Sequence, residues 1–386
     1  MTEKRPVCLA PWIHLHVDTI GEIRPCCICT LSIKADSIEE GWNSPEMKLL
    51  RVRMLNGEMP PEYCGRCINS NRTTVHSMTF DWEAEKIKLT GEELIEKTAE
   101  DGHFNLEPIS IDLRTHLCNL KCRTCSGFAS SAMRSEVIKF NLPIKQYHTT
   151  KLSDIALGDL PFIDNVRKIY WAGGEPFMSP LHWEVMDHLV KTNNTDMLVF
   201  YSTNVTFPGK TLEQAIKILK NFRELEFNIS IDGEGDYGDY VRSGIDTNEA
   251  WENIRRLREE LPHAKIKIDT TITNCGILTL DKILQRCVDL KIGWMGHLMF
   301  KSPHNNYLDE RLLKPGIFKS CIEAARAIDS RPETVKSLNF IEASYEAAEV
   351  NHKIFFECDR YEEVRGMKGF FKDKILPFLN MNEINS

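Results

Sequence analysis

The chain has 386 residues, of which 42% are hydrophobic and 27% charged, a composition that is typical of a folded globular protein and excludes a disordered one. Its length suits one large domain with appendages, or two domains. The formal net charge of −8 provides no general attraction to phosphate backbones, so it argues against nucleic acid as a partner.

The sequence contains no candidate segment for a membrane. The first residues lack the apolar core of a signal peptide, and no apolar run approaches the ~18 residues that a membrane span needs. We therefore expect a cytoplasmic protein without a membrane partner. Disulfides rarely persist in that compartment, so the thirteen cysteines, nine of them before Ser126, are better explained as metal ligands than as covalent cross-links.

Residues 8–67 predict a hairpin that ends in cysteines. Apolar and polar side chains alternate from Trp12 to Val17, which indicates a strand, and after a turn at Gly21 the chain returns through Ile23. A helix is expected over residues 44–55.

Four cysteines of this region could hold a metal centre: Cys8, Cys26, Cys64 and Cys67. Four thiolates are enough to close an iron–sulfur cluster completely or to bind zinc tetrahedrally, and the spacing alone leaves both open. Cys27 and Cys29 lie in the same turn as Cys26, and either could replace it as a ligand. The simpler interpretation of these two is a buried thiol without metal.

A second group of cysteines lies in one short loop after a predicted strand: Cys118, Cys122 and Cys125. This spacing lets one loop bind a cube-shaped iron–sulfur cluster at three of its corners, and no fourth ligand is near in the sequence. The fourth iron then has an open coordination position, so it can bind a small molecule, as an open zinc site does. A zinc site or a ferredoxin-like fragment is the alternative for these three cysteines alone.

Farther along the chain, the segment WAGGEP follows the strand-like run VRKIYW and places Gly173, Gly174 and Glu175 where a strand ends. Glycine lets the backbone approach a ligand closely, although this motif alone also suits an ordinary turn. Together, the cysteine loop and the Gly-Gly-Glu resemble the radical S-adenosylmethionine (SAM) superfamily, whose members place them after the first and second strands of a barrel. Thr124 departs from that family, which usually has an aromatic residue before the last cysteine.

From Ile109 onward, strand-like and helix-like segments alternate, which predicts parallel β/α units. One helix is expected to begin at Ser179 and Pro180, and another to cover residues 247–261. Six units are fewer than the eight of a closed barrel. The expected fold class is therefore α/β, a partial (β/α)6 TIM-like barrel with an N-terminal cysteine-rich hairpin module and a helical C-terminal extension, and the family resemblance implies the same open barrel. The strands are expected near residues 109–114, 167–172, 197–203, 226–231, 265–272 and 294–300.

These features predict four segments. The cysteine module covers residues 1–80, a charged and helix-prone connector covers 81–107, the barrel covers 108–300, and the helical extension covers 301–386.

Barrel chemistry takes place at the carboxyl ends of the strands. Polar residues follow two of the predicted strands there: Ser202 and Asn204, then Ser230, Asp232, Asp239 and Arg242. Singly, each also suits a cap or a turn. The resemblance implies that Ser202, Asn204, Ser230 and Asp232 bind SAM and that Arg242 pairs with its carboxylate. It also implies that Glu175 binds the methionine ammonium and that Gly173 and Gly174 line the same ligand.

The stretch from Gly21 to Cys26, followed by Cys64 and Cys67, resembles the twitch module, a shortened form of the SPASM domain. In better-known relatives this module follows the barrel, whereas here it precedes it. The resemblance implies an auxiliary [4Fe-4S] cluster bound by Cys8, Cys26, Cys64 and Cys67. This auxiliary cluster would be the second one, besides the [4Fe-4S] cluster that Cys118, Cys122, Cys125 and SAM would coordinate.

The remaining cysteines are isolated and are expected in the core: Cys275, Cys287, Cys321 and Cys358. Cys275 follows the fifth barrel strand, so a role as hydrogen donor to a substrate radical is its alternative. His297 and His304, near the sixth strand, suit either acid–base chemistry or a structural role, and we favour the structural one.

The resemblance implies an enzyme that cleaves SAM reductively to a 5′-deoxyadenosyl radical, which abstracts a hydrogen atom from a substrate. The expected substrate is a peptide or protein side chain, changed by oxidation, epimerisation or cross-linking. A sugar, cyclitol or nucleotide-derived small molecule is the alternative substrate, and a non-catalytic iron–sulfur or zinc-binding protein is the alternative function. The expected partners are SAM, the substrate and a reductant such as flavodoxin or ferredoxin.

Overall fold

The computed structural model describes residues 8–69, 91–125, 129–140, 155–206, 210–299, 305–346 and 362–380. The chain divides into two compact units. The first consists of Met1–His116, Thr150–Phe200 and Lys220–Glu224, and the second of Leu117–Thr149, Tyr201–Leu219 and Leu225–Ser386.

The strand order of the sheet is β2-β1-β3-β4-β5-β6-β7-β8, so the six strands β3 to β8 follow one another in chain order. Helices separate these six strands along the chain, and β2 and β8 are the two edges. This confirms the predicted α/β class and the six β/α units of a partial barrel. The strands are β1 (His14–Val17), β2 (Ile23–Arg24), β3 (Ser110–Thr115), β4 (Lys168–Gly173), β5 (Leu198–Thr203), β6 (Glu224–Ser230), β7 (Lys265–Ile272) and β8 (Gly293–Leu298).

In the first unit, the N-terminal hairpin is part of the main sheet. β1 pairs with β2 antiparallel and with β3 parallel, so that His14 lies opposite Ser110 and His16 opposite Asp112. The alternating pattern predicted this hairpin correctly. It placed the start of the first strand at Trp12, however, which is wrong. Residues Ala10–Ile13 form a short helix, α1, because Pro11 in its first turn favours helix and disfavours strand.

Arg51 holds the N-terminal helices of this unit together. It lies in α3 (Pro45–Leu55), which begins at the Ser44 cap as expected, and its guanidinium is completely buried. The guanidinium donates hydrogen bonds to the carbonyl oxygens of Pro11, Trp42 and Gly102 and to the side chain of Asn43. It also lies over the Trp42 ring, 4.6 Å from its centroid. A buried cation with this many acceptors fixes three chain segments at once.

The other helices of the first unit are short except for one that follows β4. In this longer helix, Pro180 occupies the first turn as expected, although the Ser179 side chain makes no capping hydrogen bond. In the expected connector, the structure describes residues 91–107 and finds helix there. These helices are α2 (Ile38–Trp42), α4 (Pro61–Asn69), α6 (Gly91–Glu96) and α9 (Pro180–Lys191).

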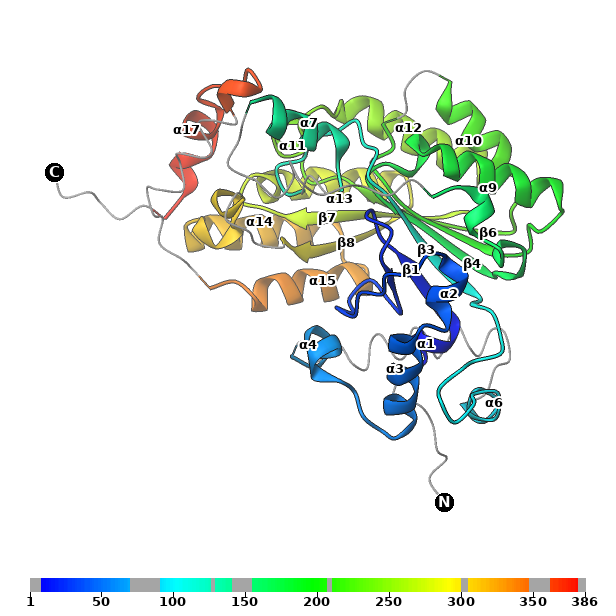
Figure 1. The fold of residues 1–386 in the computed structure, drawn as a ribbon. Helices are drawn as coiled ribbons and strands as arrows, with labels where there is room; N and C mark the ends of the chain where they lie inside the picture. Colours follow the sequence, from blue (N-terminus) through cyan, green and yellow to red (C-terminus); the bar gives the residue numbers. More distant parts are fainter. Residues whose placement is uncertain are drawn as a thin grey trace. The chain divides into compact units, whose positions relative to one another are not determined.

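In the second unit, burial alternates along β6 and β7, so that one face is apolar and the other polar. In α12 (Thr247–Glu260), Trp251, Ile254 and Leu257 are buried, as their spacing predicted. β7 and β8 lie side by side, with α15 (Pro332–Ala343) against β8 (Figure 1). A Cβ atom on Gly296 would lie 2.8 Å from Ile341 of α15, so glycine permits this close packing.

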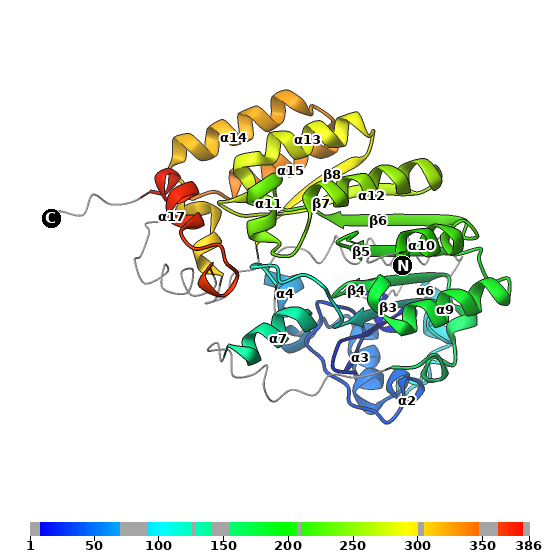
Figure 2. The same ribbon diagram turned by 90° about the horizontal axis from the view of Figure 1, so that it is seen from above.

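The described parts of the C-terminal region, residues 305–346 and 362–380, are mainly helical, as expected. Its helix α17 (Phe370–Lys374) lies beside α11 (Gly235–Val241) (Figure 2). The Phe370 ring stacks on Tyr240, with centroids 4.4 Å apart. None of the helices in the described ranges is both long and apolar enough to cross a bilayer. The remaining helices of this unit are α7 (Ser131–Lys139), α10 (Thr211–Leu219), α13 (Leu280–Asp289) and α14 (Pro315–Ile328).

Candidate functional site

The cysteine loop of the second unit contains two buried thiols, Cys118 and Cys122, and the half-buried Cys125. The backbone N–H of Leu120 donates to the Cys118 sulfur at 3.4 Å, and Asn204 Nδ2 lies 3.8 Å from the same sulfur. N–H donors aimed at a sulfur stabilise a thiolate, the form that binds metal. The donor set of this loop therefore fits an iron–sulfur cluster.

A buried ion pair lies next to these thiols. Arg242 binds Asp232 at 2.8 Å, and the exposed fractions of the two side chains are 13% and 0%. Burial raises the pKa of the Cys122 thiol, whereas the positive charge of Arg242 acts in the opposite direction. Arg242 Nε is buried and has no hydrogen-bond partner among the described residues. Since Arg242 also interacts electrostatically with Cys118, this guanidinium can bind an anion close to the loop.

Among the other expected SAM contacts in this unit, Asn204 is the one whose side-chain contacts are described in most detail. Its Oδ1 accepts from the N–H of Thr206, and its Nδ2 donates to Asn119 in the cysteine loop at 3.1 Å. Ser202 in β5 and Ser230 at the end of β6 are half-buried. Asp239 accepts a hydrogen bond from Thr247, which is a structural contact at the start of α12.

The Gly-Gly-Glu motif lies in the first unit, where β4 ends. A Cβ atom on Gly173 would lie 2.2 Å from the Thr115 carbonyl oxygen, and its φ of +103° also favours glycine. The N–H of Gly174 donates to that same oxygen at 2.6 Å. Glu175 is completely buried and caps the 3₁₀ helix Pro176–Met178 by accepting from Phe177. Close approach to β3 is thus one reason for glycine at position 173.

The N-terminal cysteines of the first unit form one neighbourhood. Cys29 hydrogen-bonds with Cys64, and this contact together with burial raises the pKa of Cys29. The Cys26 thiol interacts electrostatically with Cys29, Cys27 and Cys8. Burial and these neighbouring thiols raise its pKa. The same turn is joined to α4 by a hydrogen bond from Thr30 to the Tyr63 carbonyl. Cys27 interacts with Cys67, so all six cysteines remain candidates for the ligand set.

Sequence reasoning missed a buried polar cluster near Cys27. Asp112 Oδ2 accepts from His16 Nδ1 and from Arg114, both at 2.8 Å. Burial disfavours a charged Asp112, but Arg114 and His16 outweigh it and hold its pKa well below the usual range. Asp112 Oδ1 is buried without a hydrogen-bond partner in the described part of the chain. Polar residues at every second position of β1 and β3, in strands otherwise rich in apolar residues, were the available signal.

A second missed contact lies on β7 and β8 of the second unit. His297 Nδ1 is 2.9 Å from Asp269, and its Nε2 is 3.1 Å from the Thr271 hydroxyl. Since His297 is half exposed, an acid–base role is as well supported by this geometry as the structural role that we favoured. His304 lies outside the described residues.

The isolated cysteines are buried or half-buried where they are described. Cys275 and Cys287 are completely buried, and Cys321 is half-buried. Cys275 precedes a 3₁₀ helix after β7, and its role as a hydrogen donor stays a prediction. Cys358 is outside the described residues.

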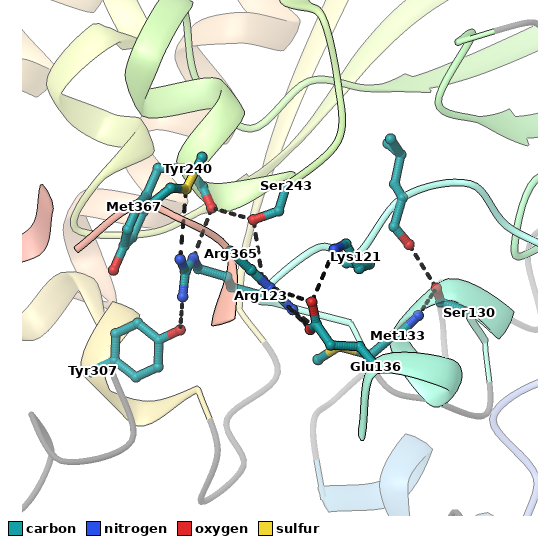
Figure 3. A network of polar contacts seen from close by, with 11 residues as sticks. Lys121, Arg123, Ser130, Met133, Glu136, Tyr240, Ser243, Tyr307, Arg365 and Met367 are labelled. Atoms are coloured by element: carbon teal, nitrogen blue, oxygen red, sulfur yellow. Dashed lines mark hydrogen bonds and ion pairs between the residues drawn. The ribbon is translucent and has the colours of Figure 1, made fainter. Parts of the chain in front are cut away.

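Arg123, between two cluster cysteines in sequence, is a further residue that the sequence did not single out. Its side chain is buried, lies 3.9 Å from the centroid of the Tyr240 ring and donates to the Tyr240 carbonyl. Figure 3 shows this arginine reaching Tyr307 and Met367 as well. The cysteine loop is therefore anchored by its own arginine.

In the ranges that the structure describes, no three histidine, cysteine or acidic side chains are arranged to hold a metal ion. The assignment of single cysteines to clusters therefore rests on the sequence and stays a prediction.

Two family models match the sequence. Residues 113–279 match the radical SAM superfamily, and residues 8–68 match SPASM, described as an iron–sulfur cluster-binding domain. No curated protein matches the sequence.

Solved structures with a similar chain path share little sequence with this protein. A histidine-tagged form of anSMEcpe with bound AdoMet is 14% identical, with a TM-score of 0.41, and the match covers 62% of this chain and 61% of that one. Streptococcus suis SuiB is 12% identical over 93% of this chain and 74% of that one, with a TM-score of 0.41. TsrM from Kitasatospora setae, with cobalamin and a [4Fe-4S] cluster bound, is 12% identical over 53% and 38%, with a TM-score of 0.36. This chain thus spans less than two thirds of the length of tagged anSMEcpe and of TsrM.

Proposed function

Because the chain belongs to the radical SAM superfamily and carries a SPASM iron–sulfur domain ahead of its radical SAM domain, we propose that it abstracts a hydrogen atom from a peptide or protein side chain. The radical SAM domain implies SAM and a [4Fe-4S] cluster as cofactors, and the SPASM domain implies auxiliary cluster binding. When bound, the first cluster supplies the electron that cleaves SAM to methionine and a 5′-deoxyadenosyl radical.

The observation that carries this proposal is the arrangement around the cysteine loop. Cys118, Cys122 and Cys125 would hold three irons of the cluster, which leaves the fourth for SAM. Arg242 offers a buried Nε without a partner in the described structure, close to two of these cysteines, and suits the SAM carboxylate. Asp232 orients Arg242 and keeps it charged.

The other SAM contacts are proposed with the roles that the sequence suggested. Glu175 would bind the methionine ammonium, and its complete burial would strengthen that charge pair. Gly173, Gly174, Ser202, Asn204 and Ser230 would line the ligand. Since the Gly174 N–H already donates to Thr115, this glycine would contribute its surface and not a hydrogen bond.

Cys8, Cys26, Cys64 and Cys67 would bind the auxiliary cluster completely, so that it transfers electrons or supports the structure and does not bind SAM. Cys29 is a further candidate, because it contacts Cys64 directly. A reductant such as flavodoxin or ferredoxin would supply the electron for SAM cleavage.

The polar cluster of the first unit supports a substrate with hydrogen-bond donors. Asp112 Oδ1 is a charged acceptor that lacks a donor among the described side chains, and Arg114 lies over the Tyr170 ring. A hydroxyl or amide group of a peptide side chain suits this site, and so does a sugar or cyclitol. For a peptide or protein side chain, the proposed modification is oxidation, epimerisation or cross-linking.

The test is the formation of 5′-deoxyadenosine. Anaerobically reconstituted protein with SAM and dithionite should form 5′-deoxyadenosine and methionine in equal amounts. A peptide encoded beside this gene should increase the rate above the substrate-free level, whereas a sugar that does so would favour the small-molecule alternative. Protein that binds iron but leaves SAM intact would contradict the proposal and favour a non-catalytic metal protein.

A further inference from the structure

The C-terminal segment 362–380 contains one buried cation that is linked to the cysteine loop by hydrogen bonds. Arg365 has a side-chain exposed fraction of 2%, and it binds the Glu136 carboxylate with two nitrogens, Nη2 at 2.6 Å and Nε at 3.0 Å (Figure 3). Its Nη1 donates to the Ser243 hydroxyl at 3.1 Å. An arginine held this way has one position and cannot move its charge away.

The partners of Arg365 are themselves attached to the cysteine loop. Glu136 also accepts from Lys121 Nζ at 3.0 Å, and Lys121 directly precedes Cys122. The backbone N–H of Lys121 donates to the Ser243 carbonyl. Burial disfavours the charged form of Glu136, but Arg365 and Lys121 outweigh it and lower its pKa, so Glu136 is ionised at neutral pH. In addition to the Arg242–Asp232 pair, Arg365, Lys121 and Glu136 thus form a charged group attached to the cysteine loop.

We propose that Arg365 is a positioning residue that raises the reduction potential of the cluster bound by Cys118, Cys122 and Cys125, and that Glu136 opposes it. The inference rests on the cluster assignment of the proposed function. The proposed function does not involve the C-terminal segment. The effect of Arg365 on the reduction potential would give this segment a role of its own.

The physical reason is the charge that the cluster gains on reduction. A cluster with three thiolates becomes more negative by one charge when it accepts an electron, so a fixed positive charge in a dry environment favours the reduced form. Arg365 is linked to Lys121, the residue next to Cys122, through both Glu136 and Ser243, so its charge lies close to the cluster ligands. A neighbouring carboxylate has the opposite effect.

The two charges therefore predict shifts of opposite sign. Arg365→Gln should make the potential more negative, and Glu136→Gln should make it less negative. A contact that is only structural predicts damage in the same direction from both variants. Arg365→Lys keeps the charge, loses the two-nitrogen geometry, and should shift the potential less than Arg365→Gln does.

The experiment is a redox titration of the reconstituted full chain, monitored by electron paramagnetic resonance on the signal that changes when SAM is added. That choice separates this cluster from the auxiliary one. Each glutamine variant should change the reduction equilibrium about tenfold, or about 59 mV for one electron. Iron content and thermal unfolding of each variant identify protein that has lost its fold.

Shifts of opposite sign in the two glutamine variants would support the inference. Shifts of equal sign, or unchanged potentials in variants with full iron content, would overturn it while leaving SAM cleavage by the wild type intact. If the wild type itself shows no SAM-sensitive iron signal, the proposed function fails and this inference is rejected with it.

Discussion

The two cysteine-rich regions contain the same ligand type in different electrostatic surroundings. The loop with Cys118 and Cys122 has N–H donors on sulfur and arginines nearby, Arg242 and Arg365. Among the N-terminal cysteines, burial and neighbouring thiols raise the pKa of Cys26, while Asp112 and Arg114 act on Cys27 and Arg24 acts on Cys29. Cations beside a site favour reduction and anionic ligands, whereas crowded thiols suit a site closed by protein ligands alone. The difference indicates which region is prepared for an added ligand.

The strongest test of this contrast replaces Cys118, Cys122 and Cys125 by alanine together. SAM cleavage should be abolished, because no protein ligand would remain for the cluster that binds SAM. Metal bound by the N-terminal cysteines should remain. Iron analysis with the 5′-deoxyadenosine assay checks both, and cleavage by the triple variant under strong reductant would show that the wrong loop was assigned.

The opposite change replaces Cys8, Cys26, Cys64 and Cys67. Iron should fall from about eight to about four per chain, if both sites hold four-iron clusters, and SAM cleavage should survive while substrate turnover falls. Replacement of Cys321, a half-buried cysteine in α14, is the matched control, and this variant should keep all iron. Four irons with one tightly bound zinc in the wild type would instead support a zinc module.

Variants of Glu175 test the proposal that its carboxylate binds the methionine ammonium of SAM. Glu175→Ala should weaken SAM binding by roughly 10- to 150-fold, the effect of losing about 1.5–3 kcal/mol from a charged hydrogen bond. Glu175→Gln separates this effect from the observed cap, because glutamine keeps an acceptor for the Phe177 N–H. Calorimetry on cluster-loaded protein measures both. Normal SAM affinity in the glutamine variant would reduce Glu175 to a structural cap.

The smallest expected effect comes from Asn204, the amide beside Cys118. Asn204→Ala removes an N–H donor to sulfur, so iron should be lost to a chelator about two- to tenfold more readily, equivalent to about 0.5–1.5 kcal/mol. Asn253→Ala is the matched control, because that buried amide donates to the Val205 carbonyl and not to a sulfur. Equal iron loss from both variants would mean that general destabilisation, and not the sulfur contact, is responsible.

Local patterns were enough to predict much of the fold. The strands near 265–272 and 294–300 were confirmed because alternating burial leaves a period of two in the sequence. The helix around Trp251 was confirmed for the corresponding reason. The strand expected at Trp12 and Ile13 was wrong, because the proline that starts α1 outweighed the alternation there.

Contacts between distant polar residues could not be predicted in this way. The pairing of β1 with β3 and the contact of Cys29 with Cys64 join segments without a shared local pattern. Arg365 is one charged residue in a charged segment, and nothing near it in the sequence marks it as buried. The cysteine loop was recognisable because its three ligands are close in sequence, whereas the charges around it are not.

The Arg365–Glu136 contact also implies an order of events during synthesis. The two residues are 229 positions apart, so at ribosomal elongation rates Arg365 is made roughly 10 to 45 s after Glu136. Throughout that interval the cysteine loop of the nascent chain lacks Arg365, so a cluster bound at that stage would have a more negative reduction potential than in the completed chain. A cluster reconstituted in ribosome-bound chains stalled before residue 362 should therefore be harder to reduce than one in completed chains.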